Sequence, residues 1–170
     1  MNGQMVLWRQ MESGDLDGVM AVANAVHPDL PESREVLAER LELFPRGCLV
    51  LERDGVIGGY AISHPIRPGE PPSLDTLLGA IPADAATYYI HDVALLPSFR
   101  GGGLARRGVL RLLEIARHFD RTGLIAVYDA AHFWARFGFV ASNRVARAKL
   151  AAYGEGAAYM EKQAAPAVAG

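Results

Sequence analysis

The sequence predicts an α/β (α+β) fold, and three observations lead to this class. Two helical patterns come first, over residues 13–27 and 31–44. Two β-rich runs follow, joined by Asp54-Gly55, which is the strongest hairpin signal in the chain. The second half then alternates a strand, a glycine-rich turn, an amphipathic helix and another strand. Helices and strands are therefore mixed along one chain, and no segment divides two cores.

The composition limits the kind of protein this can be. A chain of 170 residues, 51% hydrophobic and 21% charged, suits one globular domain, which we expect over residues 5–162, followed by a disordered tail at 163–170. A formal charge of −2 gives no electrostatic reason to expect nucleic acid as a partner. Cys48 is the only cysteine, and no apolar run reaches the roughly 18 residues of a membrane helix. We therefore expect a cytoplasmic protein without membrane contact, either a monomer or a homodimer.

Capping residues place the elements of the first half. Residues 5–9 form a short apolar strand. Ser13 caps a helix that ends near His27-Pro28. Pro31 and Ser33 open a second helix, which ends near residue 44. The apolar positions of the first helix are Leu16, Val19, Met20 and Ala23. Their spacing places them on one face, as expected for a helix packed on a sheet.

The second half begins with a long loop. Residues 65–86 are rich in proline and small residues, which predicts a surface loop with one helical turn at 74–78. Residues 87–97 form the best strand and residues 104–119 the best helix, whose interior Gly108 indicates close packing on the sheet. A strand at 122–128, a short helix within 130–140 that leads into another strand, and a closing strand at 157–163 complete the order.

The turn before the helix at 104–119 contains three consecutive glycines. Glycines are a costly start for a helix, since each loses more backbone entropy on ordering than any other residue. They do let the backbone approach a phosphate, which free N–H groups and the helix dipole bind. The Walker pattern fails because Leu104-Ala105 stand where Lys and Ser or Thr are required. A dinucleotide fingerprint fits weakly, because Arg106 occupies the position of its third small residue.

A third phosphate-binding pattern, Arg-x-x-Gly-x-Gly/Ala, fits at Arg100, Gly103 and Ala105. With the preceding strand and the following helix, it resembles the GNAT superfamily of acetyl-CoA-dependent N-acetyltransferases. Residues 133–139, FWARFGF, are similar to the aromatic helix that ends in Gly-Phe in this family, and the order of elements over residues 5–162 is similar too. The resemblance implies a mixed, mostly antiparallel central sheet with a splayed parallel strand pair, flanked by about four helices.

In the resembled family the pantetheine arm of coenzyme A lies between two splayed strands, which here would be residues 88–96 and 124–128. The resemblance implies that the N–H of Val93 donates to the thioester carbonyl as an oxyanion donor and that backbone groups of Leu95 bind the pantetheine amides. The pyrophosphate would lie on the glycine turn. The expected cofactor-binding residues are Val93, Ala94, Leu95, Arg100, Gly101, Gly102, Gly103, Leu104, Ala105 and Arg106.

A substrate ammonium needs a base, because its lone pair is occupied until a proton leaves. His91 is the best candidate, since histidine accepts protons near neutral pH. Strand alternation predicts that His91 shares a face with Tyr89 and Val93, whereas Asp92 faces the other side as a structural acceptor. The resembled family often has its base, directly or through water, at the positions of His91 and Tyr89, most closely in its arylalkylamine-acetylating members. We expect Tyr89 at most to orient a water molecule.

The departing thiolate needs a proton or hydrogen bonds. Many members of the family supply a tyrosine from the helix before Gly-Phe, but this chain has Trp134 there. An indole N–H cannot transfer a proton as a phenol does. Two alternatives remain open for the catalytic acid: Tyr128, at the end of the second splayed strand, and water.

Together these features predict an N-acetyltransferase. It would transfer the acetyl group of acetyl-CoA directly to a primary amine of a small molecule or peptide, in a ternary complex and without a metal. Two other hypotheses are a coenzyme A-binding module without catalysis, suggested by the missing tyrosine, and a dinucleotide-binding enzyme. The acceptor pocket would lie at residues 28–44 and 65–86, whose mixture of acidic, aromatic and small residues does not single out one amine.

Overall fold

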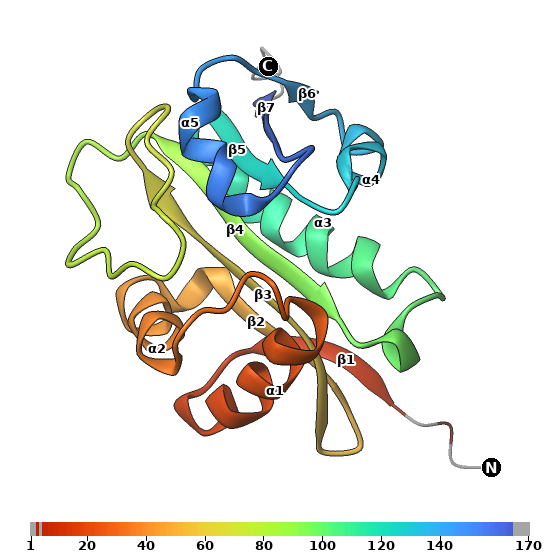
Figure 1. Cartoon of the computed structure of the whole chain (residues 1–170). Helices are drawn as coiled ribbons and strands as arrows, with labels where there is room; N and C mark the ends of the chain where they lie inside the picture. The colour runs from red at the N-terminus through yellow and green to blue at the C-terminus, as the bar shows by residue number, and fades with distance from the viewer. Residues whose placement is uncertain (1–2, 4, 165–170) are drawn as a thin grey trace, which may run out of the picture.

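A computed structural model describes residue 3 and residues 5–164, and its centre is a seven-stranded sheet in the order β1-β2-β3-β4-β5-β7-β6 (Figure 1). The strands are β1 (Val6–Gln10), β2 (Cys48–Arg53), β3 (Val56–Ile66), β4 (Thr87–Leu95), β5 (Arg121–Ala126), β6 (Val140–Ala141) and β7 (Ala158–Gln163). The α-helices are α1 (Leu16–Val26), α2 (Arg34–Leu43), α3 (Leu104–Ala116), α4 (Ala131–Ala135) and α5 (Arg147–Leu150). Only β4 and β5 pair in parallel, so the predicted mixed, mostly antiparallel sheet is confirmed.

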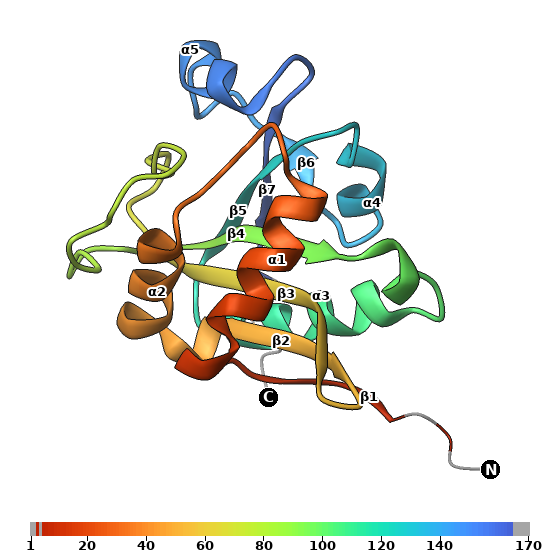
Figure 2. The ribbon, with the colours of Figure 1, turned by 60° about the horizontal axis from the view of Figure 1, so that its bottom comes forward.

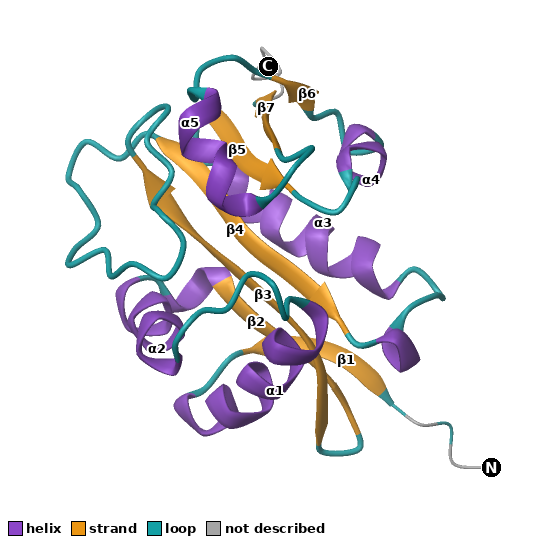
Figure 3. Cartoon of the chain, in the orientation of Figure 1, coloured by secondary structure: helices purple, strands orange, loops and turns teal. Residues whose placement is uncertain are grey.

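Helices cover both faces of this sheet. Figures 2 and 3 show α1 and α2 on one face and α3 on the other. Each face has its own apolar core: Leu16, Val19 and Val22 of α1 pack in one cluster, and Val109 and Leu112 of α3 pack in the other. We call these the α1 cluster and the α3 cluster. A strand residue whose side chain packs in one of them lies on the corresponding face of the sheet.

The interior glycine of α3 marks a close helix–strand approach, as predicted. A Cβ atom at Gly108 would lie 2.5 Å from Cζ2 of Trp8 on β1. The indole Nε1 of Trp8 also donates to the carbonyl of Leu104 at 2.8 Å. A larger side chain at this helix position would displace the indole, so the glycine is required by packing. This contact places the N-terminus of α3 against the first strand.

Several local predictions were wrong. Ser13 begins a short 3-10 turn whose N-cap is Glu12, and Glu12 and Asp15 form a capping box in which the carboxylate of Asp15 accepts the N–H of Glu12 at 2.8 Å. The helix α3 ends at Ala116, three residues before the predicted end. Helix α5 was not predicted.

The loop between β3 and β4 has no helical turn at residues 74–78, although one was predicted. Its backbone is bound instead by the carboxylate of Glu39 on α2, which accepts the N–H of Leu78 at 2.6 Å and that of Gly79 at 3.0 Å. The buried guanidinium of Arg40 donates to the carbonyl of Thr76 at 2.9 Å. Side chains of α2 therefore satisfy backbone groups that a helical turn would otherwise satisfy.

The closing strand predicted at 157–163 is β7. Its last residue, Gln163, where the predicted tail begins, pairs with Arg121. The N–H of Ala164 donates to the carbonyl of Asp120 at 2.9 Å. The rest of the predicted disordered tail, residues 165–170, lies outside the described residues.

Candidate active site

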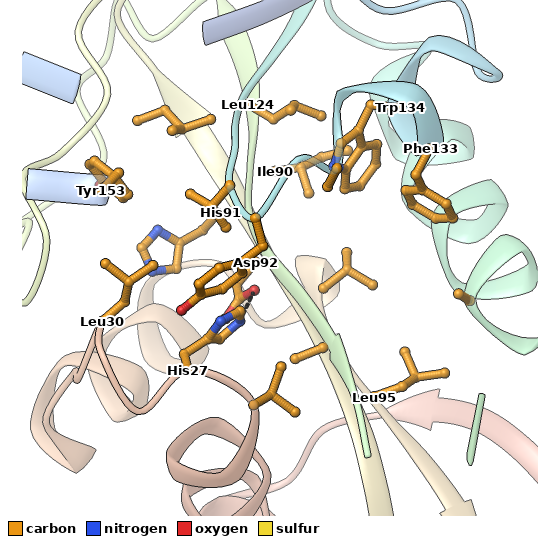
Figure 4. A pocket seen from close by; sticks show the side chains of 18 of the residues that line it. His27, Leu30, Ile90, His91, Asp92, Leu95, Leu124, Phe133, Trp134 and Tyr153 are labelled. Atoms are coloured by element: carbon orange, nitrogen blue, oxygen red, sulfur yellow. Dashed lines mark hydrogen bonds and ion pairs between the residues drawn. The ribbon is translucent and has the colours of Figure 1, made fainter. Parts of the chain in front are cut away.

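Strands β4 and β5 pair over only four residues and then separate. The last paired residues are Ile90 and Leu124, although β4 continues to Leu95 and β5 to Ala126. A cleft of about 320 Å³ occupies this region (Figure 4). Its walls are apolar residues of both strands, the segment after α1 and helix α4. The splayed parallel strands implied by the resemblance are therefore present, and a cleft lies at the point of separation.

A β-bulge on β4 decides which side chains meet in this cleft. Ser63 of β3 pairs with Ile90, but the preceding residue, Ile62, pairs with Asp92, so His91 is the additional residue of the bulge. In a regular strand, residues 90 and 94 would lie on the same face, because they are an even number of positions apart. Here Ile90, before the bulge, packs in the α3 cluster, whereas Ala94, after it, packs in the α1 cluster. The bulge therefore reverses the alternation of side chains along β4.

This reversal corrects the predicted orientation of two residues. His91 and Asp92 both face the side of α1, because Asp92 bonds a residue of that helix end and His91 bonds the segment that follows it. Asp92 was expected on the opposite face. Val93 was expected to share a face with His91, but it packs against the α3 cluster. The prediction assumed an uninterrupted strand, and one extra residue inverts every position after it.

The backbone of β4 still presents donors to the cleft. The N–H of Leu96 donates to the carbonyl of Gly58 on β3 at 2.8 Å. Because backbone groups alternate in direction along a strand, the N–H groups of Val93 and Leu95 point away from β3, toward the gap beside β5. The carbonyl of Leu95 already accepts Nε of Arg100 at 3.1 Å. Val93, Ala94, Leu95 and Arg100 all line the cleft.

His91 is paired with a carboxylate. Its Nε2 atom lies 2.6 Å from Oε1 of Glu32, and the His91 side chain is only 2% exposed. The other carboxylate oxygen of Glu32 accepts the N–H of Asp75 from the β3–β4 loop at 3.2 Å. His91 and Glu32 both line the cleft. When Nε2 donates to Glu32, the neutral imidazole has its lone pair on Nδ1, and the carboxylate stabilises the imidazolium after protonation.

A second histidine–carboxylate pair lies beside the first and was not foreseen from the sequence. Nε2 of His27, the residue that ends α1, lies 2.9 Å from Oδ1 of Asp92. The contact is the dashed line in Figure 4. The hydroxyl of Tyr60 on β3 donates to Oδ2 of the same carboxylate. His27 also stacks on the ring of Tyr128, with ring centres 5.6 Å apart. In the sequence His27 was interpreted only as the end of a helix, because no motif joins it to a strand 65 residues away.

The pKa values of this second pair are shifted by opposing effects. Burial acts to lower the pKa of His27, but its hydrogen bond and attraction to Asp92 outweigh burial and raise that pKa above its ordinary value. Burial acts to raise the pKa of Asp92, but the hydrogen bond and charge of His27 hold it below its ordinary value. Burial, with the neighbouring carboxylate of Asp92, raises the pKa of Tyr60 well above its usual range. The contact therefore raises the affinity of His27 for a proton and lowers that of Asp92.

Tyr89 does not line the cleft. It is fully buried in a separate cluster with Ile66, Val145 and Tyr159. Burial raises the pKa of its hydroxyl well above the usual value. Its ring lies 5.6 Å from that of His64, a buried histidine on β3. The structure thus separates Tyr89 from the cleft that His91 lines, although they are two residues apart.

Tyr128 and Trp134 also line the cleft, and Tyr128 does so beside His27, on whose ring it stacks. Tyr128 is 55% exposed, lines the cleft and adopts a left-handed backbone conformation with φ of 52°. Such a conformation is costly for a residue with a Cβ atom. Trp134, on α4, is buried and lines the cleft together with Phe133, against which it packs edge to face. The predicted phenol and the tryptophan are therefore both at the site.

The glycine turn has the geometry of an anion site. Gly101, Gly102 and Gly103 all have left-handed φ values, of 94°, 63° and 74°, and no other group lies within 4 Å of a Cβ built on any of them. Only glycine adopts three such conformations in succession without strain. The turn leads directly into α3, whose first N–H groups have no partner within the helix. A bound anion would satisfy these donors.

The predicted cofactor-binding residues divide into two sets. Val93, Ala94, Leu95, Arg100, Gly101 and Ala105 line the cleft. Gly102, Gly103, Leu104 and Arg106 are not part of its lining, and lie at the start of α3, where all but Leu104 are exposed. The cleft therefore runs from the histidine pairs to the glycine turn.

Among residues 5–164, no helix has the length and apolar character needed to cross a membrane. Within the same residues, no group of three or more histidine, cysteine, aspartate or glutamate side chains is arranged to hold a metal ion.

A mostly antiparallel sheet whose parallel strands separate at a cleft, with a glycine turn and helix behind it, defines the acyl-CoA acetyltransferase class of α/β proteins. The chain belongs to the acetyltransferase (GNAT) family, whose model matches residues 16–139. This match includes α1, the cleft strands, the glycine turn and α4. No curated protein matched the chain in a sequence comparison.

Solved structures share this fold. The loading GNATL domain of CurA from Lyngbya majuscula has a TM-score of 0.75 at 12% identity, over 94% of this chain and 98% of that chain. N-acetylglutamate synthase from Neisseria gonorrhoeae, complexed with coenzyme A and N-acetyl-glutamate, has a TM-score of 0.70 at 20% identity, over 96% and 36%. Naa50 from Arabidopsis thaliana, complexed with the bisubstrate analogue CoA-Ac-MVNAL, has a TM-score of 0.68 at 13% identity, over 93% and 98%.

Proposed function

We propose that this protein transfers the acetyl group of acetyl-CoA to a primary amine of a small molecule or peptide, by direct attack in a ternary complex. The observation that carries the proposal is the continuous cleft between the separated strands β4 and β5, which leads to three left-handed glycines at the start of α3. The GNAT family match supports acyl transfer. The complexes of two structural neighbours with coenzyme A or a coenzyme A conjugate support the choice of co-substrate.

The residues of the cleft fit acetyl-CoA at both ends. At one end, the glycine turn and the first turn of α3 offer N–H groups and the positive end of the helix dipole to a pyrophosphate. Arg106 is exposed in that first turn, where an anion would offset its unfavourable position. At the other end, the N–H of Val93 is directed toward the gap. Negative charge that grows on the thioester oxygen during attack would be stabilised by this donor.

His91 is the proposed base. It lines the cleft, and Glu32 fixes the proton of the neutral imidazole on Nε2, which leaves Nδ1 to accept one. Glu32 then stabilises the imidazolium that forms. The same arrangement of carboxylate and imidazole activates nucleophiles in many unrelated enzymes. Tyr89 receives no role in this proposal, because it does not line the cleft.

Tyr128 is the proposed proton donor to the departing thiolate. Of the two tyrosines among the described residues that line the cleft, Tyr128 and Tyr153, it is the one that is exposed to solvent. Burial and the nearby carboxylates of Asp29 and Asp92 raise the pKa of its hydroxyl, so the phenol is protonated at neutral pH and available as a donor. Trp134 serves to pack the α4 side of the cleft.

The lining indicates the character of the acceptor amine. Val26, Leu30, Leu74 and Tyr153 form an apolar wall around the histidine pairs. Arg100 is the only arginine or lysine among the described residues that line the cleft, and it lies at the end with the glycine turn. An acceptor with an apolar body would bury its surface here. An acceptor with a carboxylate next to the amine would find no cationic partner.

The deciding experiment measures acetyl-CoA turnover with a panel of primary amines, and the rate is monitored by the appearance of the free thiol of coenzyme A. The panel includes arylalkylamines, polyamines, amino acids and peptides with a free N-terminus. Turnover with at least one amine, and formation of the acetylated product, supports the proposal. Coenzyme A binding without turnover of any amine supports the alternative of a non-catalytic binding module. Protection of the fold by NAD and not by coenzyme A would favour a dinucleotide enzyme.

A further inference from the structure

Acetylation of an ammonium removes two protons from one nitrogen. The nitrogen of R–NH₃⁺ carries three hydrogens, and the amide R–NH–CO–CH₃ carries one. The first proton leaves before the nitrogen lone pair attacks the thioester carbon, and the second leaves after the N–C bond has formed. As the C–S bond breaks, Tyr128 gives its proton to the sulfur of coenzyme A; one of the two protons from the nitrogen then restores the phenol of Tyr128, and the other is released to solvent. A single neutral histidine accepts only one of these two protons.

We propose that His27, held by Asp92, is the second proton acceptor of the cleft, acting beside the pair of His91 and Glu32. This inference rests on the proposed function, since it assigns a role within the same reaction. His91 accepts the proton of the bound ammonium. His27 accepts the second proton once the N–C bond has formed.

The two pairs have matching geometry. In each, the Nε2 atom of a histidine meets a carboxylate oxygen, at 2.9 Å for His27 and Asp92 and at 2.6 Å for His91 and Glu32. In each, Nδ1 is buried and has no hydrogen-bond partner among the described residues, so a proton reaches it from a bound substrate or an enclosed water molecule rather than from bulk solvent. All four residues line the same cleft. The β-bulge brings the pairs together, because it turns both His91 and Asp92 toward α1 and the segment after it.

The surroundings of His27 favour proton acceptance. Asp92 of β4 lies at bonding distance, and its second oxygen accepts the hydroxyl of Tyr60 from β3. Glu32, from the segment after α1, adds a second negative charge that favours the imidazolium. Tyr128 stacks on the ring from the side of β5. His27 is also less enclosed than His91, with side-chain exposures of 12% and 2%.

A small cavity touches Glu32 of the first pair and both residues of the second. It has a volume of about 10 Å³, and its lining includes His27, Glu32, Tyr60 and Asp92. That is close to the space needed by one water molecule, and polar groups of the lining can bond it. A water molecule there would place the two carboxylates in one hydrogen-bonded network. Protons accepted by either histidine would then share a route away from the nitrogen.

The test compares His27→Gln with the parent enzyme, and His118→Gln serves as the control because His118 is exposed after α3, remote from the cleft lining. If two neutral histidines are required, the logarithm of kcat falls with a slope of about two below both pKa values, and removal of either histidine reduces the slope to about one. His27→Gln should also lose at least tenfold in kcat, because general-base assistance is typically worth about 10²–10⁴. The KM for acetyl-CoA should not change.

A second readout does not depend on activity. Nitrogen-15 spectra of labelled histidine in the parent should show neutral His27 protonated at Nε2, and Asp92→Asn should abolish that preference. A slope and kcat in His27→Gln that match those of the parent overturn the inference, as does a neutral His27 protonated at Nδ1. If His27→Gln does not fold, as judged by melting, His27→Ala with added imidazole takes its place; recovery of kcat supports the inference and absence of recovery overturns it. A parent that acetylates no amine overturns the proposed function, and this inference with it.

Discussion

Nε2 of His91 lies 2.6 Å from Oε1 of Glu32, and the two residues are 59 positions apart in the chain. Ile90 packs in the α3 cluster, so alternation along β4 turns the next residue, His91, toward the segment after α1, and a β-bulge leaves His91 without a partner on β3. A buried histidine with a carboxylate on one nitrogen has a defined tautomer, which a base requires. The same bulge places Asp92 next to His91 and against His27.

The first prediction concerns this pair. His91→Gln keeps polarity and approximate size but removes the base, so kcat with the best amine should fall by about 10²–10⁴, while the KM for acetyl-CoA is retained. The rate of the variant should continue to rise with pH, because hydroxide and free amine replace the lost base. Steady-state kinetics over a range of pH measures both effects. A variant within a few-fold of the parent, with the same acid limb, would place the base elsewhere.

The second prediction concerns the glycine turn. Gly103→Val should abolish the increase in melting temperature that coenzyme A gives the parent, because φ at this position is 74° and a side chain would stand where the anion approaches. Gly55→Val is the matched control: its φ is 81°, its Cβ also meets no group within 4 Å, and it lies in the β2–β3 turn. Both variants carry similar backbone strain. Normal protection of Gly103→Val by coenzyme A would exclude this turn as the phosphate site.

The third prediction concerns the leaving group. Tyr128→Phe retains the ring that stacks on His27 but removes the hydroxyl, so kcat should fall by about tenfold or more while thermal stability changes little. Tyr159→Phe is the control, since the Tyr159 hydroxyl is buried outside the cleft lining. The fall in kcat caused by Tyr128→Phe is then measured with two acetyl thioesters, one whose thiol is a poorer leaving group than the other. If this fall in kcat is no larger with the poorer leaving group, water rather than Tyr128 protonates the thiolate.

The fourth prediction concerns stability below neutral pH. Burial, with the adjacent His91, lowers the pKa of His64 to about 3 from its ordinary value of 6.5. Between these values the unfolded chain binds a proton that the folded chain excludes, so folding stability should fall as pH drops through this window. The loss from one such group approaches about 1.4 kcal/mol per pH unit. His64→Phe should therefore be less sensitive to acid than the parent in urea unfolding, and parallel pH curves would contradict this assignment.

The fifth prediction concerns the loop between β3 and β4. Arg40 is fully buried. Its guanidinium donates to the carboxylate of Glu39 at 2.9 Å and to the carbonyl of Thr76 at 2.9 Å. Arg40→Met should reduce the free energy of unfolding by about 3–5 kcal/mol, since it leaves a carboxylate without its buried partner. Limited proteolysis should then cut the loop at residues 67–86 faster than in the parent. The control variant Arg40→Lys keeps the positive charge and should lose less stability than Arg40→Met; an equal loss would show that the charge of Arg40 is not the source of its contribution.

Local features of this protein followed from the sequence itself. The hairpin at Asp54-Gly55, the capping of α2 by Ser33 and the glycine turn before α3 were all predicted and are all present. Each depends on a conformational preference of the residue that adopts it or on a partner a few positions away. The splayed strands came from the resemblance to a family, which the order of these local elements made recognisable.

The arrangement of the site was decided by the tertiary structure. The bulge at His91 arises from the register between β3 and β4, which no residue of β4 encodes alone. Glu32 and His27 reach β4 only when α1 packs on the sheet, and Tyr89 is enclosed by a cluster of residues from distant segments. A sequence pattern reports the preferences of neighbouring residues. Which side chains meet across the cleft depends on strand register and on packing between residues tens of positions apart, and these are settled only when the whole core forms.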